Sequence, residues 1–189
     1  MIHLTPQQAS ELRTAVELAA IRPEVRLAVG NLYLAVQDAI DLRRPVCAAS
    51  GRCCRFDEFG HRLFVTTLEL ATFVHHLAPL HVPAAHGQTG CCPFQHDRLC
   101  SVHAIRPFGC RIFFCDQTAG QWQQQQYARF HQELQRLHEQ LKVPYFYVEW
   151  RQALAAVSGR GSEHKQQPHA LPVVSTPSVA TPVIGLRSL

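Results

Sequence analysis

The sequence predicts a mainly α fold, α+β at most, in which helices flank a cysteine-rich loop region that contains a small hairpin. Three observations lead to this prediction. Apolar residues recur every three or four positions on both sides of the cysteine region. All eight cysteines lie within residues 47–115, and residues 158–189 show no periodicity. We expect a single domain over residues 1–157 and then a flexible tail, 158–189. The domain divides into N-terminal helices (1–44), a cysteine-cluster core (45–116) and C-terminal helices (117–157).

Two helices are predicted in the N-terminal part. The Thr5-Pro6-Gln7-Gln8 sequence has the pattern of an N-cap, a proline in the first turn and a capping box, which predicts a helix to about Ala20. Pro23 opens a second predicted helix, which extends to about Arg43. Apolar residues recur along one face of this helix at three- and four-residue steps. Leu27, Leu34 and Ile40 widen that face. A wide apolar face indicates burial on several sides, so this helix is expected to be central.

The middle of the chain is expected to contain only short elements. A strand is predicted within residues 61–66, and the capping-box pattern of Thr66 and Glu69 predicts a helix to about Leu77. Proline and glycine between residues 79 and 90 indicate a loop.

A small hairpin is predicted next, with residues 91–94 and 98–100 on either side of a turn at 95–97. Ser101 is expected to cap a single helical turn through Ile105, which Pro107 and Gly109 then stop.

Two more helices are predicted in the C-terminal part. Residues 121–142 have apolar residues at 3-4-3-4 spacing opposite a glutamine-rich face, and this helix is expected to pack antiparallel to the N-terminal helices. A dimer seam is the alternative use of that face. Pro144 is expected to begin the last helix, with Phe146, Trp150, Leu154 and Val157 facing inwards.

Composition narrows the classes of function. The chain has 189 residues, a net charge of +4 and a pI of about 8.7, which is too weakly basic to indicate nucleic-acid binding. The N-terminal residues lack a signal-peptide pattern, and no apolar run approaches membrane-spanning length. We therefore expect a cytoplasmic protein, where thiols stay reduced. In that compartment clustered cysteines indicate a metal site or catalysis rather than disulfides.

The chemistry of the cluster favours a soft metal. Thiolates prefer zinc, Cu(I) and iron–sulfur clusters, and four of them leave a net negative charge that needs compensation. Arg106 and Arg111 flank Cys110 and are the expected donors to sulfur around the centre. Adjacent cysteines point apart along the backbone, so one of each pair is expected to bind a metal, and the other to serve a second metal or to pack as a small apolar residue. The paired knuckles typical of zinc sites are absent, which favours an iron–sulfur cluster, with zinc as the open alternative.

An ordered set of motifs covers residues 45 to 116. These are Cys-Ala-Ala-Ser-Gly-Arg-Cys-Cys from 47 to 54, Cys-Pro-Phe from 92 to 94, Cys-Ser-Val-His-Ala-Ile-Arg-Pro from 100 to 107, and Cys-Arg-Ile-Phe-Phe-Cys from 110 to 115. This arrangement resembles the YkgJ-type CxxCxxCC cysteine-cluster family of zinc- or iron-chelating domains. The resemblance implies a bound metal, and a related domain in flagellin lysine N-methylases implies a [4Fe–4S] cluster.

The family pattern falls on a defined set of positions in this sequence. The metal ligands that the resemblance implies are Cys47, Cys53, Cys54, Cys92, Cys100, Cys110 and Cys115. Ser50 stands where the family has a further cysteine, and Cys91 lies outside the pattern. Cys91 is therefore a candidate replacement ligand for the position of Ser50.

One histidine and three acidic residues near the cysteines are also considered as parts of the site. His103 is the best histidine candidate for a ligand or a hydrogen-bond donor at the centre, Glu69 is expected to close a capping box, and Asp57 and Glu58 are expected to be solvated.

The favoured function is a cytoplasmic metal-binding protein, iron–sulfur rather than zinc, with a redox or protein-modification accessory role. The alternatives are a zinc-stabilised interaction module without catalytic activity, and a small enzyme that acts on a partner protein. Catalytic residues and oligomeric state stay unassigned. The expected partners are a metal and a protein, with no nucleic acid and no membrane.

Overall fold

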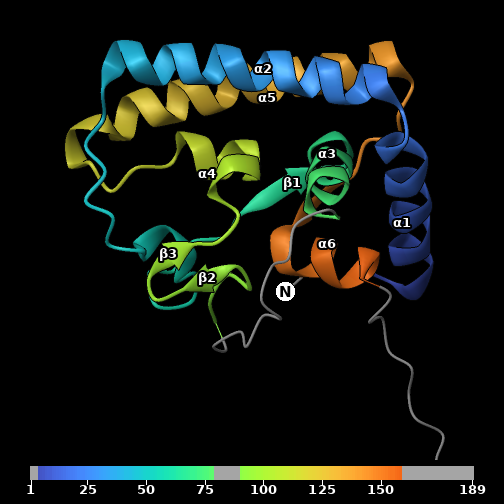
Figure 1. Cartoon of the computed structure of the whole chain (residues 1–189), viewed down its shortest axis with the longest axis horizontal. Helices are drawn as coiled ribbons and strands as arrows, with labels where there is room; N and C mark the ends of the chain where they lie inside the picture. The colour runs from blue at the N-terminus through green and yellow to red at the C-terminus, as the bar shows by residue number, and fades with distance from the viewer. Residues whose placement is uncertain (1–3, 79–89, 159–189) are drawn as a thin grey trace, which may run out of the picture.

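The computed structural model describes residues 4–78 and 90–158, and the fold is mainly helical as predicted (Figure 1). The helices of the described part are α1 Pro6–Ala20, α2 Pro23–Arg43, α3 Thr67–Leu77, α4 Phe108–Ile112, α5 Gly120–Leu141 and α6 Trp150–Val157. Its strands are β1 Phe64–Thr66, β2 Gln95–His96, β3 Leu99–Cys100 and β4 Tyr147–Glu149. Apart from Ser158, the tail predicted at 158–189 lies outside the described residues, as does most of the loop predicted between 79 and 90.

The N-terminal helices have the predicted bounds. Thr5 caps α1 through a complete capping box, because its hydroxyl accepts from the Gln8 N–H and the Gln8 side chain accepts from the Thr5 N–H. α1 packs against α3 and α6. The helix α2 ends at Arg44, which adopts a left-handed conformation.

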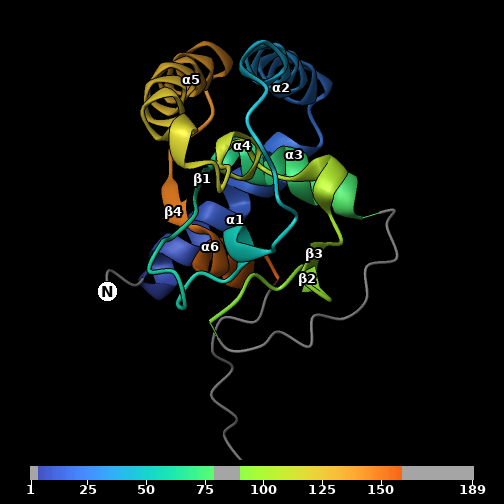
Figure 2. The ribbon, with the colours of Figure 1, turned by 90° about the vertical axis from the view of Figure 1, so that its left-hand side faces the viewer.

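The expectation that α2 is central was wrong. Val25, Val29 and Val36 are fully buried, whereas Leu27 and Leu34 are about two-thirds exposed. Figure 2 shows the reason, since α2 lies at the surface beside α5 and only one side of it meets the rest of the molecule. Two of the three residues that widen its face, Leu27 and Leu34, are therefore in solvent, whereas Ile40 is buried.

The long helix α5 runs antiparallel to α2, as predicted (Figures 1 and 2). Phe130 and Leu134 of α5 pack with Val36 of α2 and with Phe108 and Ile112 of α4 in one of two apolar clusters. The amphipathic face of α5 is thus buried inside its own chain.

The last helix is shorter than predicted. Residues 147–149 form β4, which pairs antiparallel with β1, and α6 begins only at Trp150 with Glu149 as its N-cap. The prediction of a helix from Pro144 was wrong because strand pairing with a segment more than eighty residues earlier overrides local helix propensity.

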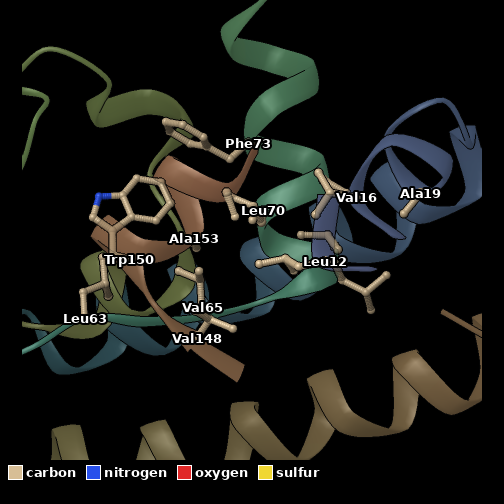
Figure 3. Close-up of a cluster of buried hydrophobic side chains, with 14 of the residues drawn as sticks. Leu12, Val16, Ala19, Leu63, Val65, Leu70, Phe73, Val148, Trp150 and Ala153 are labelled. Atoms are coloured by element: carbon tan, nitrogen blue, oxygen red, sulfur yellow. The ribbon is translucent and has the colours of Figure 1, made fainter. Parts of the chain in front are cut away.

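The larger apolar cluster lies where α1, α3, α6 and the β1–β4 pair meet (Figure 3). Trp150 is 1% exposed and packs edge-on against Phe73, with ring centroids 4.9 Å apart. Within the described residues no helix has the length and apolar character needed to cross a membrane.

The predicted hairpin is present with a shifted turn. Gln95 and His96 belong to β2, and the turn is made by Asp97 and Arg98, both with positive φ. The Ser101 hydroxyl donates to the Phe94 carbonyl and does not cap the following 3-10 turn, His103–Ile105. Pro107 is the N-cap of α4, so it begins a helix where the sequence predicted a stop.

Candidate metal centre

Seven of the eight cysteines line one cavity of about 190 Å³, which we call the cysteine pocket. They come from four segments of the chain: the turn at 47–54, the hairpin at 92–100, helix α4, and the residues that follow it. The cysteines in the pocket are Cys47, Cys53, Cys54, Cys92, Cys100, Cys110 and Cys115. The fold thus brings together the whole set that the sequence motifs indicate, and all eight cysteines are free thiols.

Cys54 is the centre of the inner part of the pocket. Its thiol lies close enough to those of Cys100, Cys53 and Cys92 to interact with them, and these interactions together with burial raise its pKa well above the usual range. The interaction with Cys54 is the main cause that lowers the pKa of Cys53 to about 6 and that of Cys100 to about 7. A weaker contribution in the same direction comes from the positive charge of Arg106. Two thiols therefore lose their protons readily, and the thiolate is the form that binds metals.

The turn that carries Cys53 and Cys54 is held against the hairpin by backbone contacts. The Cys92 N–H donates to the Cys54 carbonyl at 2.7 Å, and the Gln95 side chain donates to the Gly51 carbonyl at 2.9 Å. Gly51 has φ +70, and a Cβ at this position would lie 2.5 Å from the Arg98 carbonyl oxygen. Glycine is therefore required both for the left-handed conformation and for the close approach of the two segments.

Helix α4 positions Cys110, and a buried carboxylate attaches this helix to the core. Glu69 is 2% exposed and completes the predicted capping box of α3 with Thr66. Its other oxygen accepts from the Phe108 N–H at 2.9 Å, which fixes the first turn of α4. Burial raises the pKa of Glu69 to about 7, against the opposing effect of the hydrogen bonds from Thr66 and Phe108. Burial also raises the pKa of Cys110.

Two buried N–H groups of residues lining the pocket have no hydrogen-bond partner of ordinary geometry within the described residues: Trp150 Nε1 and Arg106 Nε. Figure 3 shows the indole nitrogen of Trp150 pointing away from the other labelled side chains of the apolar cluster. It lies near enough to Cys92 to add to the effect of Cys54, which is the main cause that lowers the Cys92 pKa. A buried donor without a partner costs about 1–3 kcal/mol, so these groups suit a pocket that contains an acceptor.

The outer part of the pocket is more open. Cys47 is exposed and Cys115 is half-buried. The Ser50 hydroxyl also lines the pocket and lies 3.8 Å from the Cys115 sulfur. Cys91 is not among the lining residues, so the structure does not bring it to the position of Ser50.

The two arginines that were predicted to donate to sulfur lie in different surroundings. Arg106 lines the pocket, as predicted for a donor to sulfur. Arg111 instead donates to the Arg106 and Ala104 carbonyls and stacks its guanidinium on Tyr33, so it braces the loop rather than facing the sulfurs. His103 lines the pocket but is exposed.

The acidic pair Asp57 and Glu58 is exposed, in accord with the prediction that these residues are solvated. Each carboxylate pairs with an arginine, Asp57 with Arg151 and Glu58 with Arg55.

The thiols are gathered but are not yet arranged as a coordination sphere. In residues 4–78 and 90–158 no three His, Cys, Asp or Glu side chains surround a common ion position. A metal would therefore have to draw the sulfurs into its own geometry.

No protein-family model, curated protein or solved structure matches this chain.

The role of Trp150 was not predicted from the sequence, where it was interpreted only as an inward-facing core residue. No local motif marks it, because the contact with Cys92 depends on how β4 and the hairpin pack. The signal that identifies it is structural: a buried indole N–H without a partner of ordinary geometry, next to a thiol.

Proposed function

We propose that the cysteine pocket binds an iron–sulfur cluster and that the protein has a cytoplasmic redox or protein-modification accessory role. The observation that carries this proposal is the convergence of seven thiols, from four segments, on one cavity that also contains two N–H donors without a partner of ordinary geometry among the described residues. Clustered reactive thiols are a liability unless they are used, because exposed thiolates oxidise.

The residues present fit such a centre. Cys53, Cys54, Cys92 and Cys100 would supply the inner thiolates, and Cys110 lies beside them, since its pKa responds to three of these thiols. An iron–sulfur cluster, when bound, supplies one-electron chemistry at a potential that hydrogen bonds to sulfur adjust. The indole N–H of Trp150 and the guanidinium of Arg106 would donate such bonds. The apolar side chains of Phe94, Phe113 and Phe114 line the same pocket and would limit access of water.

The resemblance of the motifs to the CxxCxxCC cysteine-cluster family supports a metal and leaves its identity open between iron and zinc. The positions that match the family's cysteines all lie in the pocket. Ser50 also lines it, at the position where the family has a further cysteine. The lysine N-methylase relatives suggest a reaction on a partner protein, and we propose this as the protein-modification form of the role.

A zinc-stabilised interaction module is the second candidate, and one observation favours it. The thiols of Cys53, Cys92 and Cys100 all interact with that of Cys54, and four thiolates are the number that a structural zinc site takes. In that case the pocket would hold the hairpin and the turn together without turnover.

The experiment is purification of the full chain under anaerobic conditions, followed by measurement of iron, acid-labile sulfide, zinc and the absorption spectrum. Brown protein with iron and sulfide supports the proposal. Stoichiometric zinc in colourless protein transfers support to the second candidate, and thiols paired as disulfides in the cell contradict both.

A matched pair of variants then tests the site. Cys54→Ser removes the central thiol and is expected to abolish metal retention. Cys91→Ser removes the cysteine that does not line the pocket and is expected to leave the metal content unchanged. Equal loss in both variants would place the metal elsewhere.

A further inference from the structure

A second cavity, of about 360 Å³, shares a wall with the cysteine pocket, and we call it the aromatic pocket. Four residues line both cavities: Cys53, Phe56, Cys110 and Phe113. An occupant of the aromatic pocket would therefore lie directly against two of the clustered thiols, Cys53 and Cys110. The volume falls at the lower end of the ~300–1,000 Å³ range of small-molecule sites.

Six of the fourteen residues that line this cavity carry aromatic rings, and four of them form two stacked pairs. The rings of His61 and Phe113 stack with centroids 5.3 Å apart, and those of Phe64 and Tyr147 stack at 5.2 Å. Phe113 and Tyr147 are each about 40% exposed, which is high for rings of this size. Exposed aromatic faces beside a cavity favour a flat aromatic ligand, because such rings interact through offset stacking.

Two tyrosine hydroxyls in the same cavity indicate that the ligand has a hydrogen-bond acceptor. The hydroxyls of Tyr127 and Tyr147 lie 2.6 Å apart and share one hydrogen bond. Since that bond uses one of the two phenolic protons, the pair retains one O–H donor for another acceptor. The amide of Gln123 is already bonded to the backbone of Phe114.

We propose that the aromatic pocket binds a planar heteroaromatic molecule with a carbonyl group that accepts from the Tyr127–Tyr147 pair. Binding itself does not depend on a metal. The further role of this pocket as the substrate site of the neighbouring centre rests on the function proposed above. A hydrophobic side chain of a partner protein is the competing occupant, and a saturable response to a free small molecule distinguishes the two.

The first experiment measures binding of 2-quinolone, a two-ring carbonyl compound that is inert to thiols, to the full-length reduced protein by equilibrium dialysis. Naphthalene is the matched ligand without a carbonyl. The protein is expected to bind both saturably and to bind 2-quinolone about fivefold more tightly, which corresponds to one hydrogen bond.

Protein variants assign the hydrogen bond. In Tyr127→Phe and in Tyr147→Phe the remaining hydroxyl can still donate, so each single variant should keep the preference for 2-quinolone. The double variant should lose that fivefold preference and keep its affinity for naphthalene. A double variant that retains the preference overturns the assignment, and absence of saturable binding to the parent protein overturns the pocket.

Alkylation locates the ligand without reference to metal. Cys53 is exposed and lines the aromatic pocket, whereas Cys91 lines neither pocket and serves as the internal control. In metal-free protein 2-quinolone should slow alkylation of Cys53 and leave Cys91 unaffected, as measured by mass spectrometry of the digested protein. Equal protection of both, or of neither, would show that the ligand binds elsewhere.

Discussion

Replacement of Glu69 by Gln tests how the cysteine region is attached to the helical core. The Glu69 carboxylate accepts from the Thr66 N–H at 2.8 Å and the Thr66 hydroxyl at 3.0 Å with one oxygen, and from the Phe108 N–H at 2.9 Å with the other. It is the buried group that joins the start of α3 to the start of α4. Glutamine keeps the shape of the side chain but does not titrate.

The size of the effect follows from the raised pKa. Burial raises the Glu69 pKa from 4.5 to about 7, so the folded protein holds this proton more tightly than the unfolded chain does. The resulting stabilisation is fully present below the unfolded pKa and is lost as the pH rises through the folded pKa. Between about pH 5 and about pH 8 this group therefore removes roughly 2–3 kcal/mol from the free energy of unfolding.

The assay is urea unfolding of the reduced, metal-free parent and Glu69→Gln proteins at these two pH values. The variant lacks the titration, so its deficit in unfolding free energy relative to the parent should be roughly 2–3 kcal/mol smaller at the higher pH. Infrared difference spectra should also show a protonated carboxyl band that disappears near neutral pH in the parent and is missing in the variant. A deficit that is the same at both pH values would refute the reasoning.

The remaining predictions concern the turn and the indole. Gly51→Ala should destabilise the protein more than Gly60→Ala, because both positions have positive φ but only a Cβ at 51 meets backbone, at 2.5 Å from Arg98. The strain shared by the two variants is about 1 kcal/mol, and thermal unfolding should show the excess in Gly51→Ala; equal losses would contradict the close approach. Trp150→Phe removes a buried N–H beside Cys92 and should make the reduction potential of a bound cluster more negative, whereas Phe73→Leu, which alters the same apolar cluster without removing a donor, should not. Equal shifts in the two proteins, measured by potentiometric titration, would mean that packing rather than the N–H sets the potential.

The elements that were predicted correctly are those whose signals are local. The capping boxes at Thr5 and Thr66 and the periodic face of α5 lie within a few residues of the structure that they specify. The gathering of the seven cysteines was also predicted, since ordered thiol motifs indicate a common site. The predictions failed where contacts between segments far apart in the sequence determine the local structure. β4 exists because it pairs with β1, and α4 begins at Pro107 because Glu69, far away in sequence, accepts its first N–H.

The aromatic pocket shows the same limitation for the candidate site. Its walls come from four separate pieces of the chain, around residues 53–64, 109–113, 123–127 and 147. Each aromatic residue by itself is typical of a core position, so no short pattern in the sequence predicts a cavity. The shared wall with the cysteine pocket appears only once α4 and α5 are placed.

The attachments of the cysteine region also limit what a bound metal would need to organise. The inner thiols lie on segments that the protein fixes by itself, through the bond from Cys92 N–H to the Cys54 carbonyl and through Glu69. Cys47 is exposed and lies two residues before Ala49, whose φ is positive although it is not a glycine. Movement of the chain from Arg44 to Ser50 would relieve this strain, so Cys47 can turn inwards while the core stays in place. Coupling between metal binding and folding is therefore expected to be confined to this outer segment, and not to extend through the whole of residues 47–115.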